Sequence, residues 1–148
     1  NIKNDKTGHI VDKRARRSLN SIGLDYRHGT GHGVGYFLNV HEGPQAISRG
    51  NKVKFKEGMI VSNEPGYYES GKFGIRIENL LRVKKINNFY KFENLTLAPI
   101  DKSLIQKDLL NKNEIEWLNS YHLKVYKNLK KYMNRAELNE LKNCCSNI

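Results

Sequence analysis

The chain has 148 residues, of which 38% are hydrophobic, enough for one folded domain with a modest core. Its net charge of +11 is spread along the whole chain without zinc-finger spacing, an RNP-like motif or a long basic tract, so we expect a solvated basic surface and no nucleic-acid partner. No apolar run approaches the roughly 20 residues that span a bilayer, and no secretory signal follows Asn1, so we expect no membrane partner and a cytoplasmic location.

The first predicted element is a helix over residues 8–22. Its apolar positions recur at steps of four, four and three, and they are Val11, Ala15, Leu19 and Ile22. Gly23 follows where a helix of this length would stop. Three arginines, Arg14, Arg16 and Arg17, lie off the apolar face, and we expect their charges to be solvated.

The segment RHGTGHGVGYFLNVHEGP, residues 27–44, combines three of the five histidines of the chain with many glycines. Each glycine inside a helix costs about 1 kcal/mol relative to alanine, so we expect loop and extended chain here. The three histidines are His28, His32 and His41.

Two strands are predicted next, Met59 to Asn63 and Gly74 to Val83, as a hairpin-like pair. Pro65, Gly66 and Gly71 lie in the segment that joins them. Because side chains alternate along a strand, Ile75 and Ile77 should face one way and Arg76 and Glu78 the other.

The C-terminal part predicts a long helix, whose apolar residues at spacings of three and four are Leu118, Tyr121, Val125, Leu129 and Met133. Leu138 and Leu141 extend the same pattern, and we expect the last residues, NCCSNI, to fray. The only two cysteines, Cys144 and Cys145, are adjacent, a spacing at which they rarely pair, so a reducing compartment is expected.

Six polar residues lie in apolar or glycine-rich surroundings and are the candidates for a site: His28, His32, His41, Glu64, Arg76 and Glu78. A cation would offset the cost of burying the two glutamates. An imidazole and carboxylates from separate strands suit manganese, zinc, cobalt or iron(II), and bridging carboxylates allow two ions and hydrolysis. The alternatives are ordinary structural histidines, a surface pair of Arg76 and Glu78, and glycines that serve only turns.

Three stretches, HGTGHGVGYFLNVHEGP, VSNEPGYYESGKFGIRIEN and TLAPID followed by EWLNSYH, resemble cytosolic-type X-prolyl aminopeptidases (aminopeptidase P), members of the pita-bread metallopeptidases. The resemblance runs from about Gly8 to Tyr121. It implies an α+β fold, the C-terminal half of a pita-bread catalytic domain with an antiparallel sheet flanked by helices. The whole of 1–148 would belong to that portion, with about 102–148 as a helical C-terminal extension.

The resemblance also implies roles for the six candidates. His32, Glu64 and Glu78 match the metal ligands that hold two divalent ions, typically Mn²⁺, with Zn²⁺ or Co²⁺ as alternatives. His28 and His41 match histidines that, like His32, contact the substrate, and they stabilise the tetrahedral intermediate, while Arg76 matches an arginine behind the ligands. A hydroxide activated by the metals would attack the carbonyl that precedes a penultimate proline, with Glu64 as general base. Tyrosines are candidates for contact with the proline ring, namely Tyr36, Tyr67 and Tyr68.

The family has two further aspartate ligands upstream, and Asp5 and Asp12 lack the strand context for that role. We therefore expect a fragment, inactive alone, whose partner is the N-terminal half of the same enzyme, with a homodimer as the whole assembly. The substrate would be a peptide with proline in second position. Two other functions stay open: a prolidase acting on X-Pro dipeptides, and a non-catalytic pita-bread binding module.

Overall fold

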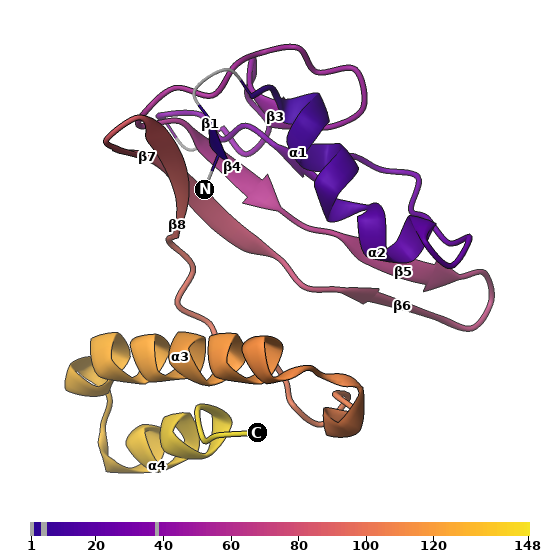
Figure 1. The fold of residues 1–148 in the computed structure, drawn as a ribbon. Helices are drawn as coiled ribbons and strands as arrows, with labels where there is room; N and C mark the ends of the chain where they lie inside the picture. The colour runs from indigo at the N-terminus through magenta and orange to yellow at the C-terminus, as the bar shows by residue number, and fades with distance from the viewer. Residues whose placement is uncertain (1, 4–5, 38) are drawn as a thin grey trace. The chain divides into compact units, whose positions relative to one another are not determined.

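A computed structural model describes residues 2–3, 6–37 and 39–148 of the chain. The chain divides into two compact units, Asn1–Thr96 and Leu97–Ile148. Strands and two short helices make up the first unit, and helices make up the second (Figure 1). Among the described residues, none of the helices is long and apolar enough to cross a membrane.

The first unit contains one four-stranded antiparallel sheet and two strand pairs. The main sheet has the order β1–β8–β7–β4, formed by Ile2–Lys3, Phe89–Asn94, Asn79–Ile86 and Ile60–Asn63. The two pairs are β2 with β3, Gly31–His32 and Ala46–Ile47, and β5 with β6, Gly66–Glu69 and Phe73–Arg76.

The predicted pairing of the two strand segments is confirmed, because β4 and β7 are antiparallel neighbours from Ile60↔Arg82 to Asn63↔Asn79. The prediction of one strand over residues 74–83 is wrong, because that segment is divided between β6 and β7. The joining segment, for which no strand was predicted, contains β5. Since β5 and β6 pair from Gly66↔Arg76 to Glu69↔Phe73, the hairpin is longer than predicted and is interrupted in its middle.

The predicted helix over residues 8–22 forms as two helices, α1 (Gly8–Ala15) and α2 (Arg17–Asn20), which lie along one side of the strands (Figure 1). Backbone hydrogen bonds continue through the break, from Arg16 N–H to the Asp12 carbonyl and from Asn20 N–H to the Arg16 carbonyl. Gly23 has a φ of +76°, so the helical segment ends where the sequence indicated.

The core of the first unit consists of Ile47, Phe55, Val61 and Val83. Val11 of α1 packs against this cluster, as its place on the apolar face predicted. The expectation that all three arginines are solvated is wrong for Arg16, whose residue is 4% exposed. Buried Asp12 and the more exposed Asp25 compensate its charge, and this makes burial of a guanidinium tolerable.

The second unit contains α3 (Lys112–Leu129) and α4 (Arg135–Cys144), with short 3₁₀ turns at Lys107–Leu109 and Lys130–Tyr132. The helices pack around four buried side chains, which are Tyr121, Val125, Leu141 and Cys145. The single continued helix that we expected is wrong, because Asn134 starts a new helix with a capping box. Fraying of the last residues is also wrong: Cys145 is buried, and the Ile148 N–H donates to Asn119 Oδ1 at 3.0 Å.

Candidate metal centre

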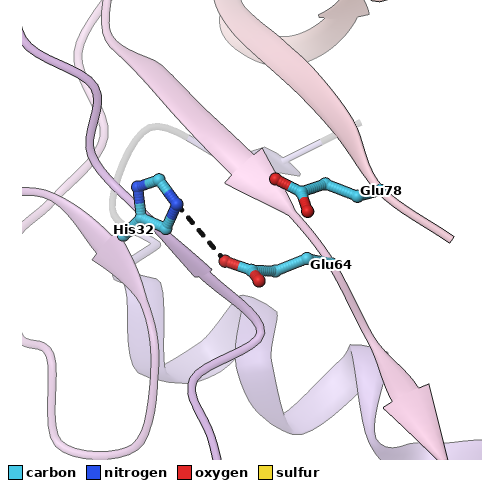
Figure 2. A group of neighbouring side chains, drawn as sticks. All are labelled: His32, Glu64 and Glu78. Carbon is cyan, nitrogen blue, oxygen red and sulfur yellow. Dashed lines mark ion pairs between the residues drawn. The ribbon is translucent and has the colours of Figure 1, made fainter. Parts of the chain in front are cut away.

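Three predicted site residues, His32, Glu64 and Glu78, come together although they are far apart in the sequence. Each offers one ligand atom, and these atoms all lie within 4.8 Å of one another. Figure 2 shows the imidazole and both carboxylates pointing toward a common space. The Nε2 atom of His32 lies 3.4 Å from Oε1 of Glu64.

The two glutamates meet because of the strand register. The pairs Asn63↔Asn79 and Gly66↔Arg76 flank the interruption of the hairpin and share one register, so Glu64 lies opposite Glu78 across it. Pro65, in the interruption between β4 and β5, has no N–H to donate to the ladder. Like charges placed directly opposite each other destabilise a strand pair. The interruption therefore puts two carboxylates where a cation would relieve their repulsion.

The orientation of His32 is fixed by its other ring nitrogen. Nδ1 lies 2.9 Å from the carbonyl oxygen of Gly33, which can only accept, so Nδ1 carries the proton. In the neutral ring, Nε2 then carries a lone pair, which faces Glu64. A backbone carbonyl at the second nitrogen is the usual support of a histidine that binds a metal.

A proton could also join His32 to Glu64, as an ordinary ion pair. The imidazolium and Arg76 would both pair with Glu64, however, whereas Glu78 forms no ion pair among the described residues. A divalent cation satisfies all three groups at once, and one nitrogen with carboxylate oxygens suits Mn²⁺, Zn²⁺ or Co²⁺. The residues present therefore fit a metal ion.

Ser62, which the sequence analysis did not single out, holds the first two of these residues. Its hydroxyl oxygen accepts from the His32 N–H at 2.9 Å and donates to Glu64 Oε1 at 2.9 Å. A Cβ on Gly31 would lie 1.9 Å from the Ser62 carbonyl oxygen, so β2 approaches β4 closely only because residue 31 is glycine.

The other predicted residues surround this group. Arg76 lies behind Glu64, with Nη1 at 3.4 Å from Oε2, and its Nε donates to the Tyr68 hydroxyl at 2.8 Å. That hydroxyl lies 2.8 Å from Nε2 of His28. The hydrogen bond to Tyr68 raises the pKa of Arg76, so the guanidinium stays charged. His41 lies on the other side, its ring centroid 4.3 Å from that of His32.

The tyrosine candidates separate in the structure. Tyr68 bridges Arg76 and His28, Tyr67 donates to Glu69 at 2.9 Å, and Tyr36 is fully exposed. Tyr68 lies beside Gly66 and Gly74, because a Cβ on either glycine would lie within 2.7 Å of its ring or hydroxyl. The glycines on β5 and β6 were the signal in the sequence that could have distinguished Tyr68.

Asp12, near the N-terminus, does not join the group. Asp5 lies outside the described residues. Asp12 is 1% exposed and is held by Arg16 and Thr30, in agreement with the expectation that it is not a ligand.

The fold and the histidine–glutamate cluster together define a metallopeptidase domain, and comparisons with known families give the same result. Residues 1–85 match the metallopeptidase family M24, and residues 88–148 match the C-terminal region of peptidase M24. The chain therefore belongs to metallopeptidase family M24.

Within that family the chain is similar to X-prolyl aminopeptidases and, over a smaller share of its length, to prolidases. The chain is 54% identical to a probable Xaa-Pro aminopeptidase P of Coprinopsis cinerea, over 83% of the chain and 22% of that relative. It superimposes on the X-prolyl aminopeptidase of Caenorhabditis elegans, a cytosolic enzyme with a di-nuclear active site, with a TM-score of 0.90 at 40% identity, covering 99% of this chain and 26% of that one. A prolidase from Pyrococcus furiosus gives a TM-score of 0.53 at 34% identity over 62% of this chain and 26% of that one.

These matches confirm the predicted fold class, part of a pita-bread domain with antiparallel strands and C-terminal helices. The chain spans about a fifth of the length of the curated relative it matches.

Proposed function

We propose that this chain is the C-terminal part of the catalytic domain of a metal-dependent aminopeptidase that removes the first residue from peptides with proline in second position. The observation that carries the proposal is the convergence of His32, Glu64 and Glu78 within 4.8 Å in a chain of family M24. The 54% identity to a probable Xaa-Pro aminopeptidase P supports the choice of substrate. A helical extension over about 102–148 belongs to the same proposal.

His32, Glu64 and Glu78 would hold two divalent ions together with two aspartates from the rest of the enzyme. The di-nuclear site of the Caenorhabditis elegans relative supports the number of ions. We propose Mn²⁺ because the resemblance to aminopeptidase P implies it, and the mixed imidazole and carboxylate ligands suit it as they also suit Zn²⁺ or Co²⁺. When bound, the ions lower the pKa of water and so supply a nucleophile at neutral pH.

The side chains of this chain would divide the remaining work. Glu64 would take up the proton of the attacking water, and Arg76 keeps positive charge beside that carboxylate at 3.4 Å. His28, which lies beside Tyr68, and His41, which lies beside His32, would hold the substrate and stabilise the tetrahedral intermediate. In the neutral ring, Nε2 of His28 accepts from Tyr68, since Nδ1 donates to the Gly29 carbonyl at 2.7 Å.

The test uses the full-length enzyme loaded with Mn²⁺. We expect release of the first residue from an X-Pro-X tripeptide, loss of this activity with a chelator, and loss in Glu64→Ala. Glu116→Gln, at an exposed position of α3, is the matched control and should keep wild-type activity. Intact cleavage by Glu64→Ala would contradict the proposal.

A prolidase is the second candidate, because solved prolidases share the fold over 62% of the chain. Comparing an X-Pro dipeptide with an X-Pro-X tripeptide distinguishes the two, since a prolidase should prefer the dipeptide. The similarity to a cytosolic enzyme further supports a cytoplasmic location, and we propose a homodimer, which sedimentation of the full-length enzyme would test.

A further inference from the structure

A buried ionic cluster lies at the end of α1, outside the group of proposed ligands. The Arg16 guanidinium donates from Nε to both carboxylate oxygens of Asp12, at 3.0 and 2.9 Å, and from Nη1 to Asp25 Oδ1 at 2.7 Å. Burial by itself lowers the pKa of Arg16, but the hydrogen bonds to the two aspartates outweigh burial and raise it. The guanidinium is therefore permanently charged and fixed by its fork of donors.

The same guanidinium also holds main chain. Nη1 donates to the Tyr26 carbonyl at 2.7 Å, Nη2 donates to the His28 carbonyl at 2.6 Å, and the guanidinium carbon lies 3.9 Å from the centre of the Tyr26 ring. Residues 24–30 form neither helix nor strand, so no ladder of backbone hydrogen bonds fixes them. One side chain thus determines where the His28 backbone lies.

Thr30 connects the cluster to the backbone of Glu64, the second of the two proposed catalytic groups. Its hydroxyl donates to Asp12 Oδ1 at 2.6 Å and contacts the Tyr26 hydroxyl, and its residue is fully buried. Its carbonyl accepts the Glu64 N–H at 2.7 Å. Asp12, Arg16, Tyr26 and Thr30 therefore form a closed ring of contacts that touches the backbone of both His28 and Glu64.

We propose that Arg16 is a positioning residue of the active site: it fixes residues 26–30 so that the His28 imidazole and the Glu64 carboxylate keep their relative positions. The inference rests on the proposed function, in which those two groups act on one peptide bond. A displacement of about 1 Å of a catalytic group can cost 10²-fold in rate, so a fixed main chain here has a measurable effect. A lysine keeps the charge but has a single nitrogen, which cannot meet four acceptors.

The experiment compares Arg16→Lys with Arg14→Lys in the Mn²⁺-loaded full-length enzyme. Arg14 is exposed on the same helix and is the matched control. At a temperature well below unfolding, and per bound metal, we expect Arg16→Lys to lower kcat about 10- to 100-fold with KM changed less than about threefold. Arg14→Lys should stay within about twofold of the wild type. An Arg16→Lys enzyme with wild-type kcat overturns the inference.

A second pair of variants covers the case in which Arg16→Lys does not fold. Thr30→Val removes the hydroxyl that joins Asp12 to Tyr26 and keeps the volume, and Thr30→Ser restores the hydroxyl. We expect Thr30→Val to lower kcat about tenfold and Thr30→Ser to recover most of it. Equal kcat values for the two variants overturn the inference.

A double-mutant cycle separates positioning from a general loss of stability. If Arg16 acts through His28, Arg16→Lys should cost much less in a His28→Ala enzyme than in the wild type. Equal losses in both backgrounds overturn the inference. A wild type that fails to cleave X-Pro bonds refutes the proposed function instead. In that case the crystal structure of Arg16→Lys still tests whether Arg16 is a positioning residue. Residues 26–30 should shift relative to β4 and β7, and an unmoved segment overturns the inference.

Discussion

Two pairs of carboxylates lie in the first unit of this protein, and their charges are balanced in different ways. Asp12 and Asp25 share the guanidinium of Arg16, which hydrogen-bonds to both, and Asp25 also forms an ion pair with Arg49. Glu64 and Glu78 lie opposite each other in the interrupted hairpin, and the nearby cation, Arg76, is 3.4 Å from Glu64 and partly exposed. The first pair is complete within the chain, whereas the second leaves charge for an ion to neutralise.

The difference has a thermodynamic meaning. Removing one partner of a complete buried ion pair leaves an uncompensated charge and destabilises the fold. Removing one of two carboxylates that repel each other relieves strain in the metal-free protein while it removes a ligand. Stability and activity should therefore respond in opposite ways at the two clusters.

The largest expected effect is that of Glu78→Gln on activity. If Glu78 is a metal ligand as proposed, its loss should lower kcat/KM about 10³-fold, since bound metal ions can contribute several kcal/mol to catalysis. The metal-free variant should unfold at the same temperature as the metal-free wild type or higher, because the repulsion with Glu64 is gone. Assays with Mn²⁺ and thermal unfolding in chelator measure the two effects. Strong destabilisation of the metal-free variant would show that Glu78 is part of a structural ion pair.

The complementary change is Arg16→Met, which keeps the length of the side chain and removes its charge. Asp12 is left buried without a cation, so the free energy of unfolding should fall by about 3 kcal/mol or more. Urea unfolding of the metal-free full-length enzyme measures the change. Arg14→Met, at an exposed position, should cost less than about 0.5 kcal/mol. Similar costs for both variants would contradict a complete internal ion pair at Arg16.

Another buried titratable group is His122, in the second unit. It is fully buried, its Nε2 accepts from the Ile100 N–H at 3.1 Å, and its Nδ1 has no hydrogen-bond partner among the described residues. Burial, and then the charge of Lys102, lower the pKa of His122 below its ordinary value of 6.5. The folded state thus keeps the ring neutral at a pH where the unfolded state already takes up a proton.

Stability conferred by this histidine is therefore complete above pH 6.5 and is lost as the pH falls below it, by up to about 1.4 kcal/mol per pH unit. His122→Gln keeps an acceptor for Ile100 and cannot titrate. Hydrogen exchange of α3 in the full-length enzyme should show wild type and variant diverging between pH 7.5 and 5.5, with the wild type losing protection. Parallel profiles would show that His122 does not titrate differently on unfolding.

The sequence was informative where local signals and functional residues coincide. The end of the first helical segment at Gly23 and the strand at Ile60–Asn63 follow from composition and periodicity. The group of His32, Glu64 and Glu78 followed from polar residues in unusual surroundings and from the family resemblance, and the structure brings the three side chains together.

What could not be predicted depends on contacts between distant segments. Arg16 lies beside the apolar face of its helix, and periodicity cannot show that Asp25 and two carbonyls of a later loop surround it. β5 could not be predicted from the sequence because Pro65, Gly66 and Gly71 are residues typical of turns. Its pairing with β6 appears only once the register of the whole hairpin is known.

The start of α4 is different, because its signal is local and was overlooked, and it provides the smallest expected effect. Asn134 accepts from the N–H groups of Ala136 and Glu137 at 2.9 and 3.0 Å, while Glu137 accepts from the Asn134 N–H at 2.8 Å. Asn134→Ala should lower the free energy of unfolding by about 1 kcal/mol, whereas Asn134→Asp, which keeps the acceptor, should stay near the wild type. Hydrogen exchange of α4 in the full-length enzyme measures both. Equal protection of Asn134→Ala and wild type would mean that packing of Leu141 and Cys145, rather than the cap, fixes where this helix begins.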